Sequence, residues 1–168
     1  MGEIFIKGLY FLLLGVIVII IPIAPISTTP TIIGIPDTLI CLIFSWLVID
    51  QKSAPLLSIL FLCLLADILW MRPIGLWPMF ILLTSELVRH YRLRIVNQST
   101  LFKCFCFLLF FSIINVGVKL LSLVVALKPL DFMMWLKYFL FTILLFPIVN
   151  FCLEYTIFRR ENNSGKVI

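Results

Sequence analysis

Residues Ala66–Trp77 read ADILWMRPIGLW, and this stretch decides how the chain folds. It places a carboxylate, Asp67, and a guanidinium, Arg72, in strongly apolar surroundings, close to a proline and a glycine. Hydrocarbon penalises charged side chains by several kcal/mol unless they are paired or solvated. The stretch therefore predicts the end of one apolar helix, a turn and the start of the next helix, with two charges that need partners.

The composition of the chain indicates which solvent surrounds it. Of its 168 residues, 63% are hydrophobic and 12% are charged, whereas a soluble domain has roughly 25% charged residues. So little polar surface cannot coat a globule in water, and we expect an integral membrane protein. The five cysteines lie in apolar runs, and the chain has a single histidine, His90. We expect the cysteines to be small hydrophobic helix residues, with no disulfide, metal or cofactor.

The apolar runs predict six membrane-spanning helices in one all-α bundle. A helix needs about 20 residues to cross ~30 Å of hydrocarbon. The predicted spans are residues 8–27, 36–50, 54–71, 74–89, 101–127 and 132–158. They form one transmembrane domain over residues 1–160, which a short polar tail follows over residues 161–168.

Lysine and arginine predict the orientation, because cytoplasmic segments of membrane proteins are rich in them. The outer connections hold only Arg72 and Lys128, and Lys119 and Lys137 lie within spans. With the N-terminus inside, the other nine basic residues lie in cytoplasmic segments: Lys7, Lys52, Arg89, Arg92, Arg94, Lys103, Arg159, Arg160 and Lys166. We therefore expect both termini, including the polar tail, to be cytoplasmic.

The second and fourth spans are short, at about 15 residues or roughly 22 Å. Such a helix must thin the bilayer or end beneath its surface under a cover of protein. The uncharged segment Ser27–Ile35 lies beside the outer end of the second span. We expect this segment to roof a recess that opens outwards.

The orientation places five charged residues in the outer leaflet: Asp37, Asp67, Arg72, Lys119 and Lys137. Asp67 and Arg72 are five residues apart, which is not the spacing that pairs well along one helix. We expect Arg72 to pair with Asp37 or to reach lipid phosphates, and Asp67 to pair with Lys119. Pro36 and Asp37 also fit the first turn of a helix, as an N1 proline and a carboxylate near the positive end of the helix dipole. Salt bridges that fix helix packing are favoured over catalysis.

The carboxylates lack the motifs of an intramembrane aspartyl protease, which needs two facing carboxylates that share a proton. Those proteases carry Tyr-Asp and Gly-x-Gly-Asp, whereas Asp67 follows CLLA and Asp37 follows Pro36. No glycine-rich phosphate loop occurs, and His90 lies at the inner end of the fourth span, away from a serine nucleophile. We expect a protein that is not an enzyme.

A second charged set lies at the inner end of the fourth span: Glu86, Arg89, His90, Arg92 and Arg94. Basic residues at this depth commonly reach the lipid headgroups. We expect the set to anchor the helix end to the membrane, with a partner-binding basic loop as the alternative.

Two stretches resemble the MreD family of rod shape-determining proteins: PDTLICLIFSW from Pro36, and SAPLLSILFLCLLADILWMRPIGLWPMFILLTSELVR from Ser53. Members have Pro-Asp near the second span, an apolar helix ending in Gly-x-x-x-Asp-Leu/Ile-Leu, and a glycine where the next span begins. Asp67 and Gly75 match this pattern. Cys63 replaces the usual glycine, and it is still small enough for a close helix contact.

The resemblance implies a non-enzymatic inner-membrane component of the bacterial cell-elongation complex, required for cell shape and lateral peptidoglycan synthesis. Its implied partner is the single-span protein MreC, and through MreC the actin-like MreB, the polymerase RodA and a class B penicillin-binding transpeptidase. The implied fold is similar to substrate-binding components of energy-coupling-factor transporters, which are also six-helix bundles. We expect membrane lipid to surround the chain, and we expect no nucleic-acid partner.

Two hypotheses stay open on these grounds. One is an assembly scaffold that binds MreC. The other is a small-molecule binding or transport component that uses the outer recess, because kinship of fold does not transfer an activity.

Overall fold

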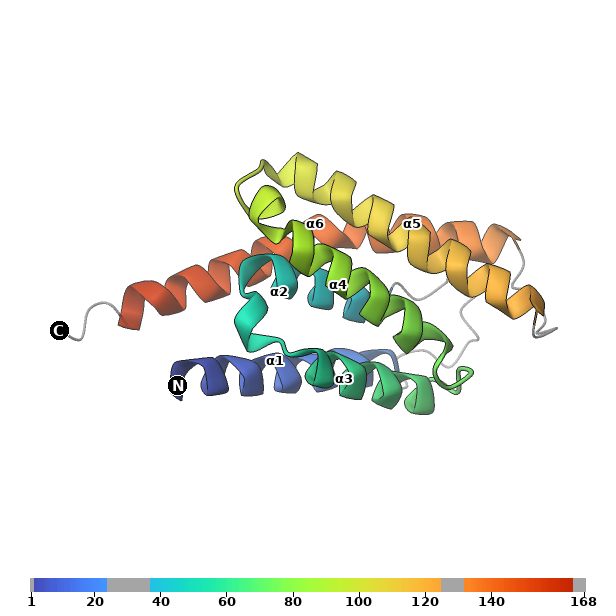
Figure 1. Cartoon of the computed structure of the whole chain (residues 1–168), viewed down its shortest axis with the longest axis horizontal. Coiled ribbons are helices and arrows are strands. Elements are labelled where there is room, and N and C mark those ends of the chain that lie inside the picture. The colour runs from blue at the N-terminus through green and yellow to red at the C-terminus, as the bar shows by residue number, and fades with distance from the viewer. Residues whose placement is uncertain (1, 24–36, 125–131, 165–168) are drawn as a thin grey trace.

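The computed structural model describes residues 2–23, 37–124 and 132–164 (Figure 1). Within these ranges the chain is helical and has no strand, which confirms the expected all-α class. The six α-helices are α1 (Gly2–Ile20), α2 (Thr38–Ile49), α3 (Leu56–Leu69), α4 (Leu76–Val96), α5 (Thr100–Val124) and α6 (Phe132–Ser164). Two short 3-10 helices, η1 (Ile21–Ile23) and η2 (Gln51–Ser53), follow α1 and α2.

Two of these helices are long and apolar enough to cross a membrane. Their apolar segments are Thr100–Leu121 in α5 and Trp135–Thr156 in α6, each of 22 residues, or about 33 Å at 1.5 Å per residue. Shorter apolar stretches occupy α1, α2 and α3 in the described part of the chain.

Successive helices run in opposite directions, so their connections alternate between two ends of the molecule (Figure 1). We call one end the Lys7 end, where α1, α3 and α5 begin. The other is the Asp37 end, where α2, α4 and α6 begin. The α3–α4 turn, within the stretch Ala66–Trp77, lies at the Asp37 end.

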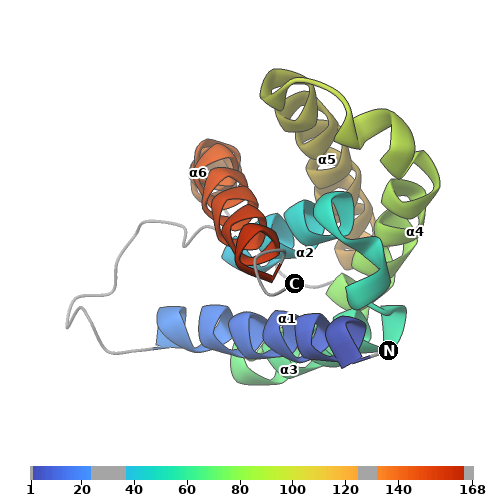
Figure 2. The same cartoon turned by 90° about the vertical axis from the view of Figure 1, so that its left-hand side faces the viewer.

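Helix α2 lies in the middle of the molecule, where α1, α4 and α6 pack around it (Figure 2). All ten residues from Leu39 to Val48 are buried, so no face of α2 points outwards. Its 12 residues span about 18 Å. The helix is therefore a short central element, wrapped by longer neighbours.

Two helices are longer than the apolar runs indicated. Helix α4 continues to Val96 and has 21 residues, about 31 Å, so the expectation of a helix of about 15 residues there is wrong. The length of its membrane-spanning part stays a prediction. Polar and basic residues of its last two turns are good helix formers, and they pack against the end of α2 instead of ending the helix. Helix α6 continues through Pro147 to Ser164, past residue 161, at which the polar tail was expected to begin.

An aromatic cluster joins the central helix to α5 and α6. The rings of Phe107 and Phe146 stack with centroids 4.1 Å apart, and Phe44 of α2 meets them edge-on at 5.4 and 5.5 Å. Such pairs contribute about 0.5–1.5 kcal/mol each beyond the burial of their surface. Gly117 allows α5 to approach α4, because a Cβ there would lie 2.3 Å from the ring of Phe80.

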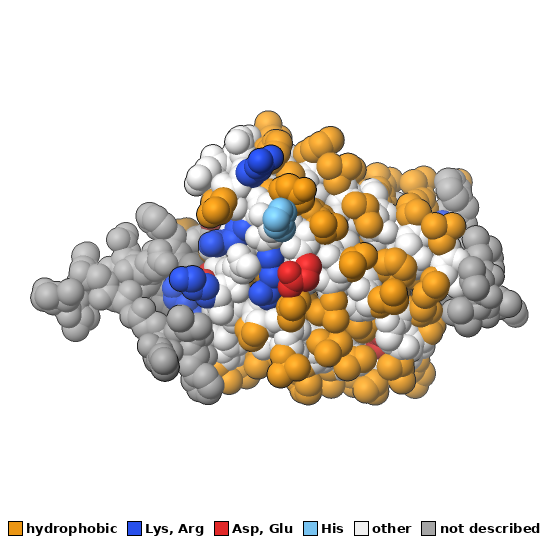
Figure 3. Space-filling model, viewed as in Figure 1, with side chains coloured by type: hydrophobic (Ala, Val, Ile, Leu, Met, Phe, Trp, Pro, Cys, Tyr) orange, Lys and Arg blue, Asp and Glu red, His pale blue; other side chains and the backbone are white. Residues whose placement is uncertain are grey.

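The outward faces of the helices are apolar. Exposed side chains on the two longest helices include Leu109, Ile113, Leu144 and Ile148. Figure 3 shows hydrophobic side chains over most of one face, with Lys and Arg gathered toward the Lys7 end. Soluble monomers rarely expose contiguous apolar surface of this kind, so lipid or protein is its natural cover.

Candidate functional site

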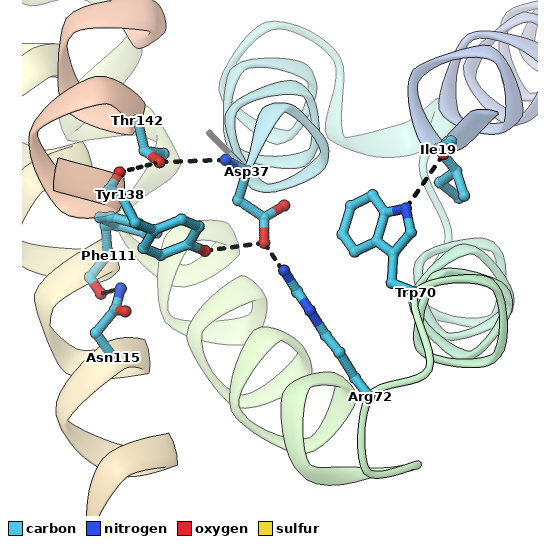
Figure 4. A network of polar contacts seen from close by, with 8 residues as sticks. All are labelled: Ile19, Asp37, Trp70, Arg72, Phe111, Asn115, Tyr138 and Thr142. Atoms are coloured by element: carbon cyan, nitrogen blue, oxygen red, sulfur yellow. Dashed lines mark hydrogen bonds and ion pairs between the residues drawn. The ribbon is translucent and has the colours of Figure 1, made fainter. Parts of the chain in front are cut away.

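A single buried carboxylate joins three parts of the fold at the Asp37 end. Asp37 directly precedes α2 and is 2% exposed. Its Oδ2 accepts hydrogen bonds from the hydroxyl of Tyr138 at 3.0 Å and from Nη1 of Arg72 at 3.2 Å (Figure 4). Its backbone N–H donates to Oγ1 of Thr142 at 3.2 Å. Helix α2, the α3–α4 turn and α6 therefore meet at Asp37.

Arg72 points into the molecule and lies between two indole rings. Its guanidinium carbon lies 4.6 Å from the ring centre of Trp70 and 4.7 Å from that of Trp77. Trp70 in turn donates from Nε1 to the carbonyl of Ile19, which ties the turn to α1 (Figure 4). Cation–π contacts contribute about 0.5–2 kcal/mol. The predicted pairing of Arg72 with Asp37 is confirmed, and the alternative contact with lipid phosphate is not needed to satisfy it.

Asp67 shapes the turn between α3 and α4. Its Oδ2 accepts from the backbone N–H of Gly75 at 3.0 Å, and its carbonyl accepts from the N–H of Arg72 at 2.9 Å. Gly75 precedes α4 with φ of +92°, where another residue would cost about 1–2 kcal/mol. A carboxylate at this place also faces the positive end of the α4 dipole.

The expected pairing of Asp67 with Lys119 is therefore wrong. Lys119 lies on α5, and its Nζ lies 3.7 Å from the ring centre of Trp135 on α6. The residues share a leaflet in the predicted orientation, but they face different neighbours. Asp67 finds its hydrogen-bond donors in the turn that follows its own helix.

The remaining predicted residues have different outcomes. Cys63 is 2% exposed and lies on the buried face of α3, as a close helix contact requires. Pro36 lies outside the described residues, as do Lys128 and the segment Ser27–Ile35 that was expected to roof an outer recess.

Two arginines at the Lys7 end have a role that the sequence analysis missed. Arg92 donates from Nε to the carbonyl of Val48 at 3.0 Å and from Nη2 to that of Ile49 at 2.6 Å. Arg89 donates to the carbonyl of Ala54. The last carbonyls of a helix have no partner within it, so Arg92 caps the C-terminal end of α2. Arg89 instead holds the connection between η2 and α3. Both were expected to reach lipid headgroups.

The signal that could have identified these arginines is their spacing. Arg92 lies four residues after Val88 and three before Ile95, both of which are buried. A helix places residues three or four apart on one face, so Arg92 belongs to the inward face of α4. His90 and Arg94 are exposed, as a headgroup anchor would be.

Ion pairs join helix ends at the Lys7 end as well. Lys103 of α5 lies 2.7 Å from Glu154 of α6, and Lys7 of α1 lies 3.7 Å from Asp50. Neither ion pair was predicted from the sequence. Charged residues at both ends of the bundle therefore serve contacts between helices.

A small, half-open cavity of ≈ 20 Å³ lies between α2, α4 and α5. Its lining is mostly apolar and includes Ile43, Ile81 and Phe107. This volume suits about one water molecule, whereas sites for small organic ligands commonly have about 300–1,000 Å³. A shallow groove of ≈ 360 Å³ also lies between α1 and α3, and its lining is apolar apart from Ser58.

Comparisons of the chain with protein-family models, curated proteins and solved structures found no match. A function for the chain is therefore inferred from its sequence and from the geometry of the described residues.

Proposed function

We propose that this chain is an MreD-like assembly scaffold of the bacterial inner membrane. It binds MreC and takes part in lateral peptidoglycan synthesis without being an enzyme. The observation that carries the proposal is the use of the charges at the Asp37 end: Asp37, Asp67 and Arg72 all hold helices or turns of their own chain together. Charges used in this way hold a shape for a partner to recognise.

The proposed membrane arrangement is a six-helix bundle with both termini in the cytoplasm. The Lys7 end then faces the cytoplasm and the Asp37 end faces outwards. Among side chains that the structure describes, six basic residues lie toward the Lys7 end: Lys7, Lys52, Arg89, Arg92, Arg94 and Lys103. Arg72, Lys119 and Lys137 lie toward the other, and this asymmetry supports the orientation.

Rigidity of the Asp37 end is what the scaffold supplies to its partner. The contacts of Asp37 with Arg72, Tyr138 and Thr142 connect elements that are 35 to 105 residues apart in the chain. A surface held in its binding conformation loses less conformational entropy on association. MreC bound there or along the apolar helix faces would link the chain to MreB, RodA and the class B transpeptidase.

The alternative, a small-molecule binding component, needs the outer recess beneath Ser27–Ile35. That segment lies outside the described residues. The cavity of ≈ 20 Å³ between α2, α4 and α5 is too small for such a ligand. The shallow groove of ≈ 360 Å³ between α1 and α3 is large enough, but its lining offers one polar side chain, Ser58, where a ligand site combines several converging polar groups. The scaffold is therefore the function that the described geometry supports best.

Co-purification in a mild detergent tests the proposal. The tagged chain should retain an MreC-like single-span protein, and Asp37→Ala should weaken that association and give rounded cells at unchanged membrane level. Arg94→Ala, which changes an exposed arginine at the other end, is the matched control and should leave both unchanged. Retention of a small molecule together with an ATPase pair, and no single-span partner, would contradict the scaffold and support transport.

The orientation has a separate test. A reporter that is active only outside the cytoplasm should give no signal when it is fused after Ile168. The same reporter inserted between α5 and α6 should be active. An active C-terminal fusion at normal expression would contradict the proposed topology.

A further inference from the structure

The α3–α4 turn exposes apolar side chains and turns its charged side chains inwards, the reverse of a turn that faces water. Met71 is 95% exposed and Ile74 is 69% exposed, and Pro73 between them is exposed as well. The charged residues of the same turn face inwards: Arg72 points toward Asp37 (Figure 4), and Asp67 is 2% exposed. Turns in water present Gly, Asn, Asp and Ser, because these residues bond to the local backbone and to solvent. This turn presents an apolar tip.

The exposed tip is held in place by specific contacts. Met71 has φ of +51°, a left-handed conformation that costs a residue with a side chain about 1–2 kcal/mol. Within the tip, the N–H of Arg72 donates to the carbonyl of Asp67, and the guanidinium of Arg72 donates to Asp37. Directly after the tip, the N–H of Gly75 donates to the carboxylate of Asp67. A strained backbone persists where its surroundings over-determine it, which is common at functional positions.

Nearly all backbone N–H groups of the turn have a hydrogen-bond acceptor within the described residues. Trp70 donates to the carbonyl of Ala66 and Met71 to that of Ile68. Pro73 has no N–H. Between residues 70 and 75, the N–H of Ile74 is the one donor without an acceptor among the described residues. Backbone groups that lack partners are costly in hydrocarbon. The carbonyls from Leu69 to Ile74 accept no hydrogen bond from the described residues, so the backbone of the turn must lie where these carbonyls reach the headgroups, while its apolar side chains reach the acyl chains.

Helix length places the tip at the boundary of the hydrocarbon. Helix α3 has 14 residues, about 21 Å, which is shorter than a hydrocarbon core of ~30 Å. Its first turn lies at the Lys7 end, beside the carbonyl to which Arg89 donates. With that end at the cytoplasmic interface, the turn reaches the upper acyl chains of the outer leaflet. Trp70 and Trp77 flank the tip, as aromatic residues do at this depth.

We propose that the α3–α4 turn is a lipid contact: Met71, Pro73 and Ile74 insert among the upper acyl chains of the outer leaflet. The partner of this surface is the lipid itself. The inference rests on the membrane orientation given under the proposed function.

Spin-label accessibility in vesicles tests this inference. The full chain is reconstituted in phosphatidylcholine after Cys104, Cys106 and Cys152 are replaced by alanine; the buried Cys41 and Cys63 are kept. A nitroxide is placed in turn at Met71→Cys and at Ile74→Cys. Collision with oxygen, which concentrates in hydrocarbon, is compared with collision with a water-soluble nickel complex.

Two control positions give the reference values. Gln98→Cys, exposed in the α4–α5 turn, should report water, and Leu144→Cys, 70% exposed near the middle of α6, should report lipid. We expect the oxygen-to-nickel ratio at residues 71 and 74 to be severalfold higher than at residue 98 and to approach that at residue 144.

The controls separate the possible failures. A ratio at residues 71 and 74 equal to that at residue 98 would place the tip in water and overturn the inference, while the Leu144 value still supports the membrane orientation. Low collision with both reagents would show a protein contact, such as a second copy of the chain, and would also overturn it. A watery ratio at residue 144 would instead overturn the membrane arrangement on which the proposed function rests.

Discussion

Neutralising Arg72 should destabilise the bundle because it leaves a buried charge behind. Arg72→Met keeps an apolar stem between the two tryptophan rings and removes the guanidinium. The carboxylate of Asp37, 2% exposed, then retains only the hydroxyl of Tyr138 as a side-chain donor among the described residues. We expect a large loss of stability from this single substitution.

The magnitude follows from the geometry of the pair. At 3.2 Å two unit charges attract by about 5 kcal/mol with an effective dielectric constant near 20. Desolvation offsets part of this attraction, and removing one partner of a buried pair typically costs ~3–5 kcal/mol. Asp37→Asn should cost less, because Arg72 is 28% exposed and keeps its aromatic contacts. The double variant removes both charges, so its cost should fall below the sum of the two by about 1–3 kcal/mol.

The assay is a double-mutant cycle on reversible unfolding in mixed micelles of a mild detergent and dodecyl sulfate, followed by helical circular dichroism. Arg94→Met is the control, since it removes an exposed arginine from α4. Strictly additive costs, or a cost of Arg72→Met no larger than that of the control, would refute the pairing as a source of stability.

The other predictions use the same unfolding assay. Arg92→Met should cost about 1.5–3 kcal/mol, because it removes charge-assisted hydrogen bonds to the last carbonyls of α2; a cost equal to that of Arg94→Met would contradict the cap. Asp67→Asn should be milder than Asp67→Ala, because the amide oxygen still accepts from the N–H of Gly75; equal costs would show that this bond contributes nothing. Cys63→Leu should cost about 1–3 kcal/mol by overpacking a buried position, whereas Cys63→Ala should cost less, and the reverse order would exclude a close contact there.

The pairing of Arg72 with Asp37 could be predicted from two properties alone, the predicted depth of each residue in the membrane and the sign of its charge. Both residues stand at helix ends on the same side of the membrane in the predicted orientation, and their side chains have opposite charge. The same reasoning failed for Asp67 and Lys119. Depth says nothing about the direction in which a side chain leaves its helix, and Lys119 meets the ring of Trp135 instead.

The role of Arg92 was missed for a related reason. A basic residue at the end of an apolar run reads equally well as a headgroup anchor and as a cap for a neighbouring helix. The choice depends on where α2 ends, and α2 ends beside α4 only after the two helices have packed. The packing of α2 against α4 thus decides which of the two roles Arg92 has.

The amino-acid sequence alone accounts for the all-helical class, the approximate places of the six helices, and the turn at Pro73 and Gly75. These features depend on local hydropathy and on backbone restrictions of single residues, which are readable along the chain. Only the tertiary structure placed α2 at the centre, turned Arg92 inwards and exposed Met71 at the tip of a turn. The rotation of each helix about its axis, and hence the neighbours of its charges, is set by packing against helices distant in sequence.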